Sequence, residues 1–162
     1  MHIIADIGGT KLRIAKSKDL RTFADTVILE TPQNYDEGLK LLAVTAKRLA
    51  GHEPIETLIA GCPASLTPDR KSLLQATVSD WTGKSLADDL EKMLQTRVHL
   101  ENDTVLGGLG EAHFGAGIGS RILVYYTVST GINGVRIVEG NVEPSTFVSD
   151  VNGHPCVMTK RV

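Results

Sequence analysis

The stretch from Asp6 to Lys11 has the chemistry of a phosphate-binding loop. Gly8 and Gly9 leave their backbone N–H groups unshielded by side chains, and Thr10 and Lys11 add a hydroxyl and a cation beside them. Asp6, two residues earlier, offers a carboxylate that would hold a hydrated Mg²⁺ against the same phosphates. The same residues also suit an ordinary Gly-Gly hairpin with a solvated aspartate, since Asp and Gly are common turn residues.

Asp103 is the second candidate for chemistry. Phosphoryl transfer to an alcohol needs a carboxylate that accepts the hydroxyl proton. Asp103 follows the apolar run 98–100, and open α/β sheets place their ligand sites at the carboxyl ends of such strands. Its neighbour Asn102 carries an amide donor and acceptor that suit an adjacent sugar hydroxyl. The alternative is that Asn102 and Asp103 only cap the next helix, because both residue types are preferred N-caps.

The elements that must position these residues alternate between short apolar runs and helical periods, which indicates the α/β class. Helices are expected to begin at Asn34, where Glu37 completes a capping box, at Ser85, and after Asp103. Beyond Gly140 no further element is expected. Strands are predicted at 2–6, 11–16, 24–30, 57–61, 98–100, 122–128 and 135–138, the first two joined by the Gly-Gly turn.

Composition excludes several classes of protein. The net charge of −2 over 162 residues gives no electrostatic footprint for nucleic acid. No apolar run reaches the roughly 18 residues of a membrane span, and the first residues lack the pattern of a signal peptide. Cys62 and Cys156 are too few for a disulfide framework. A reduced, cytoplasmic protein that contacts neither nucleic acid nor membrane is therefore expected.

Three segments, in this order, resemble the ROK branch of the sugar kinase, Hsp70 and actin superfamily. They are DIGGTK at 6–11, the END tripeptide at 101–103 with EAHFGAG at 111–117, and the strand and turn at 124–135. The resemblance covers roughly residues 1–141 and implies a ribonuclease H-like (actin-like ATPase) lobe with a mixed five-stranded sheet and flanking helices at 1–117. Residues 118–162 would then open a second, nucleotide-binding lobe, so that the chain corresponds to about half of such an enzyme.

The resemblance also implies an activity, the ATP-dependent phosphorylation of a hexose of the glucose or N-acetyl-hexosamine type at its primary hydroxyl. Asp103 would act as the base on that hydroxyl, and Asn102 would hold the sugar. The resemblance further implies phosphate contacts at Gly8, Gly9, Thr10, Lys11, Thr130 and Gly131, sugar contacts at Pro63, Ala64 and His154, and Mg²⁺ held through water by Asp6.

Several positions depart from the family pattern. Ser129 stands where the second phosphate turn has glycine, so an ordinary glycine-containing hairpin remains an alternative there. Ala64 replaces a loop glycine, and Val151 replaces a glutamate that precedes the sugar-contacting histidine. Cys156 has no cysteine nearby, and no zinc site is predicted, because tetrahedral zinc needs four ligands. Trp81 is expected to pack in the core rather than to form a sugar platform.

Two functions stay open. One is a ROK-type hexokinase, and the other is a truncated or degenerate protein that binds a sugar or a partner without catalysis. A ROK repressor is less favoured, because those proteins place a helix-turn-helix before a loop that here begins at residue 6. The chain by itself is expected to have little hexokinase activity, since one lobe cannot close around ATP. The apolar strand 122–128, with no later helix to cover it, predicts a two-fold homodimer.

Overall fold

A computed structural model describes residues 1–128, 132–143, 148–149 and 155–156 of the chain. Its contacts divide the chain into two compact units, Met1–Glu101 and Asn102–Val162. The expected lobe boundary at residue 117 concerns the complete two-lobed enzyme and stays a prediction. Among the described residues, no helix is both long enough and apolar enough to span a membrane.

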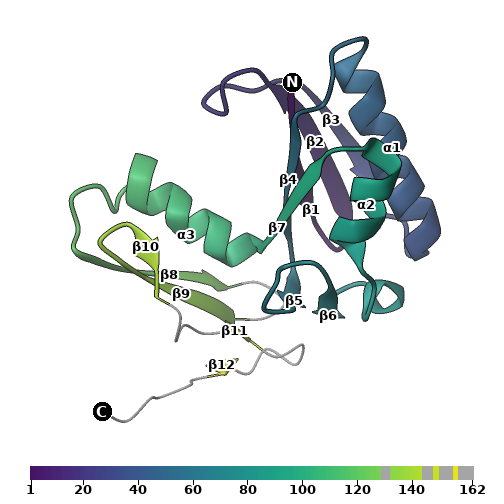
Figure 1. The fold of residues 1–162 in the computed structure, drawn as a ribbon. Helices are drawn as coiled ribbons and strands as arrows, with labels where there is room; N and C mark the ends of the chain where they lie inside the picture. The colour runs from purple at the N-terminus through teal and green to yellow at the C-terminus, as the bar shows by residue number, and fades with distance from the viewer. Residues whose placement is uncertain (129–131, 144–147, 150–154, 157–162) are drawn as a thin grey trace. The chain divides into compact units, whose positions relative to one another are not determined.

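The first unit is built on the predicted mixed five-stranded sheet (Figure 1). The strand order is β3-β2-β1-β4-β7, in which β1 runs antiparallel to β2 and parallel to β4. The bounds agree with the sequence prediction to within two residues at each end. The strands are β1 (His2–Ile7), β2 (Lys11–Ser17), β3 (Ala24–Glu30), β4 (Thr57–Cys62) and β7 (Arg97–Asn102).

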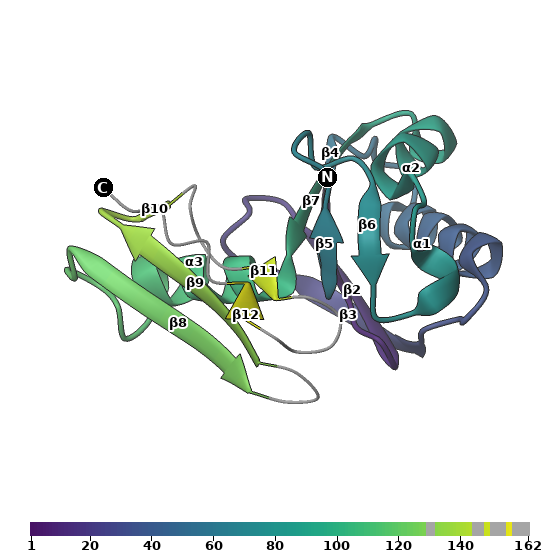
Figure 2. The ribbon, with the colours of Figure 1, turned by 90° about the horizontal axis from the view of Figure 1, so that it is seen from below.

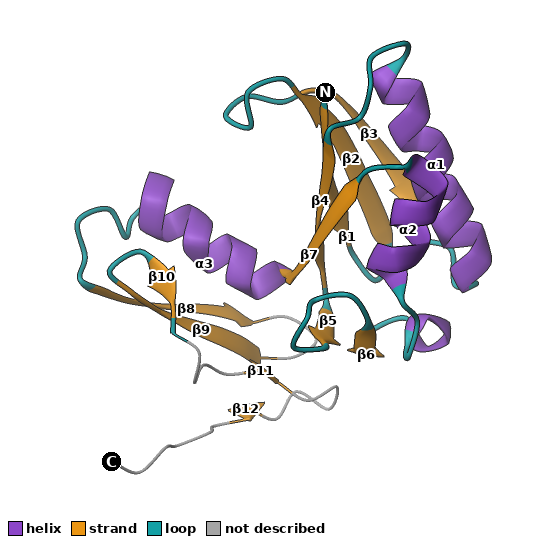
Figure 3. Cartoon of the chain, in the orientation of Figure 1, coloured by secondary structure: helices purple, strands orange, loops and turns teal. Residues whose placement is uncertain are grey.

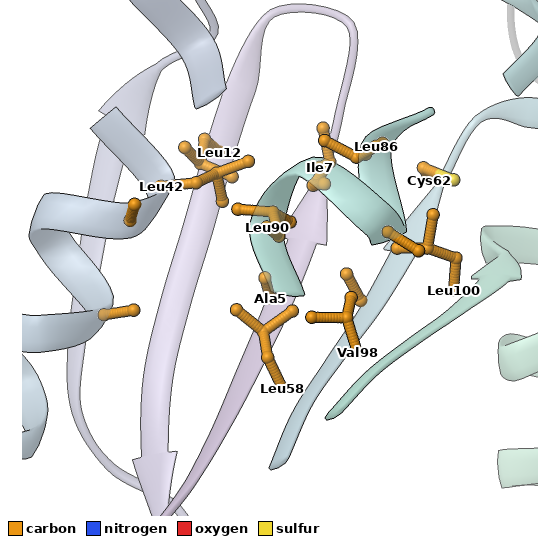
Figure 4. Close-up of a cluster of buried hydrophobic side chains, with 14 of the residues drawn as sticks. Ala5, Ile7, Leu12, Leu42, Leu58, Cys62, Leu86, Leu90, Val98 and Leu100 are labelled. Atoms are coloured by element: carbon orange, nitrogen blue, oxygen red, sulfur yellow. The ribbon is translucent and has the colours of Figure 1, made fainter. Parts of the chain in front are cut away.

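Two helices, α1 (Tyr35–Ala50) and α2 (Leu86–Leu94), cover one face of this sheet (Figure 3). Alternate residues of the strands point into the core between helices and sheet, where they meet leucines such as Leu42 of α1 and Leu90 of α2 (Figure 4). Each large apolar side chain buried in this way stabilises the fold by about 1.5–3 kcal/mol. The period-two pattern therefore leaves the other residues of β1, including Asp6, on the opposite face.

The helix ends follow local signals in the sequence. The side-chain oxygen of Asn34 accepts a hydrogen bond from the Glu37 N–H at 3.1 Å, so the predicted N-cap is confirmed. The α1 helix ends at Gly51, whose φ of 64° favours glycine. The second helix starts where predicted, but Ser85 does not cap it. Its hydroxyl instead lies 3.1 Å from the Ser72 hydroxyl.

A short hairpin follows β4, in a stretch where no strand was predicted. It consists of β5 (Ala64–Leu66) and β6 (Leu73–Ala76), paired antiparallel. The 3₁₀ turn η1 (Ser79–Trp81) comes next and buries Trp81, which is 2% exposed. The Trp81 ring packs edge-on against the Tyr35 ring at a centroid distance of 5.6 Å. The predicted packing role of Trp81 is therefore confirmed.

The second unit consists of α3 (Asp103–Phe114) and the strands β8 (Ile122–Val128), β9 (Ile132–Val138) and β10 (Asn141–Val142). Figure 2 shows β9 between β8 and β10, with α3 behind them. The β9 strand begins three residues earlier than predicted. The expectation of no element beyond Gly140 is wrong, because β10 pairs with β9 and β11 (Val148–Ser149) pairs with β12 (Pro155–Cys156).

The expectation that β8 lies open for lack of a later helix also needs correction. The α3 helix packs on one face of β8 and β9, where glycine permits a close approach. A Cβ on Gly108 would lie 2.4 Å from Cγ1 of Val135, and one on Gly107 would lie 2.9 Å from the Tyr125 ring. The helix that covers this face precedes the strands in sequence. The alternate β8 side chains stay exposed, with Tyr126 at 59% and Val128 at 76%.

Asp19, in the turn after β2, makes the stability of the fold depend on pH. Asp19 accepts hydrogen bonds from the backbone N–H groups of Thr22 and Arg21, which lower the pKa of its carboxyl from 3.8 to about 2. A carboxyl whose pKa is lower in the folded protein than in the unfolded chain stabilises the fold at pH values above the unfolded-state pKa. This stabilisation is lost as the pH falls from about 4 to 2. We expect the Asp19→Asn variant to lose less stability than wild type over that interval. Thermal unfolding at a series of pH values measures this difference. An equal fall in unfolding temperature for the variant and wild type between about pH 4 and 2 would contradict it.

Candidate functional site

The predicted phosphate loop is a tight hairpin between β1 and β2. The N–H of Gly8 donates to the Lys11 carbonyl at 2.9 Å, which leaves Gly9 and Thr10 at the tip. A Cβ on Gly8 would lie 2.7 Å from the Lys11 carbonyl oxygen, so any other residue would disturb this closure. A Cβ on Gly9 would lie 3.0 Å from the methyl group of Thr77. Gly8 therefore permits the close approach to Lys11, and Gly9 permits the close approach to Thr77 in the segment after β6.

Thr31, which the sequence analysis did not single out, holds this loop from the end of β3. Its hydroxyl donates to the Gly8 carbonyl at 2.7 Å, and its N–H donates to the Thr10 carbonyl at 2.9 Å. Thr31 is a buried polar residue with 6% exposure. Among the described residues, no acceptor lies within hydrogen-bond reach of the N–H groups of Gly9 and Thr10. Two backbone donors are therefore available to an anion at the loop tip.

Asp6 lies on the face of the sheet opposite the core, directly across from Arg13 in the β1–β2 register. The Arg13 Nη1 donates to Asp6 Oδ2 at 2.7 Å, and both side chains are 51% exposed. An ion pair as exposed as this contributes about 0–1 kcal/mol. A carboxylate in such a pair remains accessible to a hydrated cation, so Asp6 fits the water-mediated Mg²⁺ role that the sequence suggests.

The predicted sugar residues Pro63 and Ala64 lie beside the Gly8-Gly9 loop within the first unit. A small apolar pocket is lined by Gly8 and Ile7 of the loop side and by Cys62, Pro63 and Ala64 of the β4–β5 connection. The Pro63 carbonyl accepts from both the N–H and the hydroxyl of Thr77, at 3.2 and 3.1 Å. The structure therefore brings two of the separately predicted segments together.

Asn102 and Asp103 stand at the junction of β7 and α3. The Asn102 Oδ1 accepts from the N–H groups of Thr104 and Val105 at 3.0 and 3.3 Å, so Asn102 is the N-cap of α3. The alternative that Asn102 caps the next helix is therefore correct for its Oδ1 atom. Asp103 is the first helical residue, and its Oδ1 accepts from the Thr104 N–H at 2.7 Å. The helix N-terminus stabilises a negative charge at this position.

The first residue of the END tripeptide has an anchoring contact that the sequence did not indicate. The Glu101 carboxylate forms an ion pair with Arg70 Nε at 3.2 Å, and both residues belong to the first unit. Arg70 lies in the β5–β6 turn with a φ of 60°. The hairpin after β4 therefore holds the end of β7 directly before the candidate base.

Three predicted site residues, Thr130, Gly131 and His154, lie outside the described residues, as does the side chain of Cys156. Within the described part of the chain, no group of three or more His, Cys, Asp or Glu side chains is placed to hold a metal ion. Cys62 is buried, and its thiol donates to the Glu101 carbonyl oxygen at 3.7 Å. The absence of zinc stays a prediction.

Known proteins are similar to this chain in sequence and in fold. The ROK family model matches residues 3–147. The glucokinase of Halalkalibacterium halodurans is 27% identical in an alignment 150 positions long, which covers 87% of this chain and 45% of that protein. A crystal structure of a ROK family glucokinase from Streptomyces griseus, in complex with glucose and AMPPNP, is 25% identical. It aligns with a TM-score of 0.78 over 88% of this chain and 46% of that one.

A ROK family transcriptional regulator, a homologue of the E. coli MLC protein, also aligns with a TM-score of 0.78, over 88% of this chain and 37% of that one. At 16% identity that likeness shows the fold alone. The aligned structures confirm the predicted sugar kinase and actin-like ATPase fold. The chain spans about half the length of the curated relatives it matches.

Proposed function

Because the chain belongs to the ROK family, we propose that it supplies the sugar-phosphorylating residues of an ATP-dependent hexokinase. The substrate would be a hexose of the glucose or N-acetyl-hexosamine type, phosphorylated at its primary hydroxyl. One observation carries the proposal: the glycine loop at 8–11 keeps backbone donors available for an anion. The relatives also support it, since glucokinases match over most of this chain.

In this proposal Asp103 accepts the proton of the sugar hydroxyl as that oxygen attacks the terminal phosphate. Both hydrogen bonds that Asp103 accepts from Thr104 use Oδ1, so we assign the proton to Oδ2. Asn102 would orient the reacting sugar from the adjacent position. Pro63 and Ala64 of the first unit, and His154, would complete the sugar contacts.

ATP and Mg²⁺ are the proposed cofactors, and the AMPPNP bound to the Streptomyces griseus glucokinase supports ATP use. The N–H groups of Gly9 and Thr10 and the Lys11 ammonium would hold phosphate oxygens. Asp6 would hold Mg²⁺ through water, and the ion would neutralise charge on the phosphates. Thr130 and Gly131 are proposed as a second phosphate contact. We propose no zinc.

A coupled assay for ADP formation tests the proposal with glucose, N-acetylglucosamine and N-acetylmannosamine. We expect little turnover from the 162-residue chain alone. We expect turnover from a fusion in which it replaces the matched segment of the Halalkalibacterium halodurans glucokinase. A fusion that is folded and monodisperse yet phosphorylates none of the sugars would contradict the proposed function.

The alternative is a non-catalytic protein that binds a sugar or a partner. Calorimetric titration of the same fusion with glucose separates the two. Sugar binding without any turnover would favour the non-catalytic protein, whereas binding with turnover would favour the kinase. Cytoplasmic location and a lobe division at residues 117 and 118 belong to the same proposal.

We also propose that the chain forms a two-fold homodimer through β8. This strand lies at the edge of the described three-stranded sheet, and its exposed face carries Ile122, Val124, Tyr126 and Val128. An apolar edge strand pairs readily with a second copy of itself. Sedimentation velocity at micromolar concentration should show a dimer, and Val124→Lys should give a monomer. A monomeric wild type whose 122–128 amides exchange freely would overturn this.

A further inference from the structure

A buried hydroxyl fixes the orientation of one peptide group in the phosphate loop. Thr31 Oγ1 donates to the Gly8 carbonyl oxygen at 2.7 Å, across 23 residues of sequence. Gly8 has its other backbone group fixed as well, since its N–H donates to the Lys11 carbonyl at 2.9 Å. Thr31 is 6% exposed, so water does not compete freely for its hydroxyl. The loop is therefore held by a side chain that does not belong to it.

The direction of that bond determines where the next N–H points. No described peptide bond is cis, and in a trans peptide the C=O and the following N–H point in opposite directions. Because the Gly8 carbonyl points toward the Thr31 hydroxyl, the Gly9 N–H points away from it. Among described groups, nothing accepts from that N–H. Thr31 thus turns an available donor outward from the loop.

Thr31 is itself held by the core of the first unit. The next residue is Pro32, which restricts Thr31 to extended backbone. The Pro32 carbonyl accepts from Nε1 of Trp81 at 3.2 Å, and Trp81 is 2% exposed. The Thr31 N–H adds a second bond, to the Thr10 carbonyl at 2.9 Å. The hydroxyl therefore has a defined position before any ligand arrives.

We propose that Thr31 is a positioning residue for phosphate binding, because its hydroxyl keeps the Gly8–Gly9 peptide in the orientation that presents the Gly9 N–H to an anion. This inference rests on the proposed function of residues 8–11 as a phosphate loop. Without the hydroxyl, the Gly8 carbonyl loses its partner. Rotation of the Gly8–Gly9 peptide toward solvent would give the carbonyl a new partner and would turn the Gly9 N–H inward.

The test follows backbone amides of the 17.4 kDa protein in ¹H–¹⁵N spectra during titration with magnesium pyrophosphate. In wild type we expect the Gly9 and Thr10 amides to shift on binding. Thr31→Val, which keeps the shape and removes the hydroxyl, should bind about tenfold more weakly. Thr31→Ser should restore binding. Thr45→Val, at a buried threonine of α1 away from the loop, is the matched control and should bind as wild type does.

Spectra without ligand give an independent readout. Thr31→Val should shift the Gly9 amide and increase its fast motion in ¹⁵N relaxation, and Thr31→Ser should not. If Thr31→Val does not fold, Thr31→Ala can be compared with Thr31→Ser, because these two variants differ only in the hydroxyl oxygen. A Gly9 amide unchanged in the hydroxyl-free variants, or unchanged pyrophosphate affinity, would overturn the role of Thr31. If no amide of the wild-type protein shifts with pyrophosphate, the proposed phosphate binding by residues 8–11 is wrong. The spectra without ligand would still show whether Thr31 orients the Gly9 N–H.

Discussion

Replacing Asp103 by Asn is expected to lower hexose turnover by about 100-fold or more, while the Michaelis constant for the sugar changes little. The amide keeps the shape of the carboxylate and can still accept the Thr104 N–H through Oδ1, so α3 keeps its first turn. An amide cannot accept the proton of the attacking hydroxyl, and a positioned base contributes about 10²–10⁴-fold to rate. The coupled assay on the active fusion measures this loss.

Glu139→Gln is the matched control for that substitution. It removes one carboxylate charge from the same unit, at a side chain that is 73% exposed and pairs with Arg121 at 3.9 Å. Its turnover should equal that of the unmodified fusion. Equal turnover of Asp103→Asn and Glu139→Gln would show that Asp103 only begins the helix, as Asn102 caps it.

Replacing Trp81 by Ala is expected to cost about 3–5 kcal/mol of unfolding free energy. The Trp81 side chain fills the space between α1 and the segment after β6, where a Cβ on Gly38 would lie 2.1 Å from its ring. The substitution also removes the bond from Nε1 to the Pro32 carbonyl. Because domains are stable by only about 5–15 kcal/mol, a large part of the protein would unfold at room temperature in mild urea.

Urea unfolding followed by circular dichroism tests the Trp81 prediction. Val44→Ala is the matched control, because Val44 lies on the solvent face of α1 with 54% exposure. Its unfolding free energy should stay within about 0.5 kcal/mol of wild type. Equal midpoints for the two variants would mean that the ring contributes little to the core.

Features with local causes could be predicted from the sequence. The Gly8-Gly9 hairpin and the Asn34 cap both depend on residues within four positions of each other, so their signals survive without knowledge of the fold. The Asp6–Arg13 pair was not predicted. Counting outward from a Gly8-Gly9 tip places Asp6 opposite Lys11, but the observed closure by Gly8 and Lys11 puts Gly9 and Thr10 at the tip and Asp6 opposite Arg13.

The features that the sequence did not reveal depend on long separations or on very short elements. The strands β5 and β6 have three and four residues, too few for an alternating pattern to stand out. The contact of Thr31 with Gly8 spans 23 residues, and a single threonine before a proline gives no sign of it. The helix that covers β8 precedes that strand, so a search for cover in the later sequence alone could not find it.

The glycines of α3 bear on the order in which the second unit folds. Gly107, Gly108 and Gly110 fall within twelve residues, and each costs a helix about 1 kcal/mol relative to alanine. An isolated segment of this composition is mostly coil in water. We therefore expect the β8–β9 hairpin to form first and to act as the template on which α3 condenses. Gly108 thus permits close packing of α3 on β9, but the same glycines make α3 slow to form by itself.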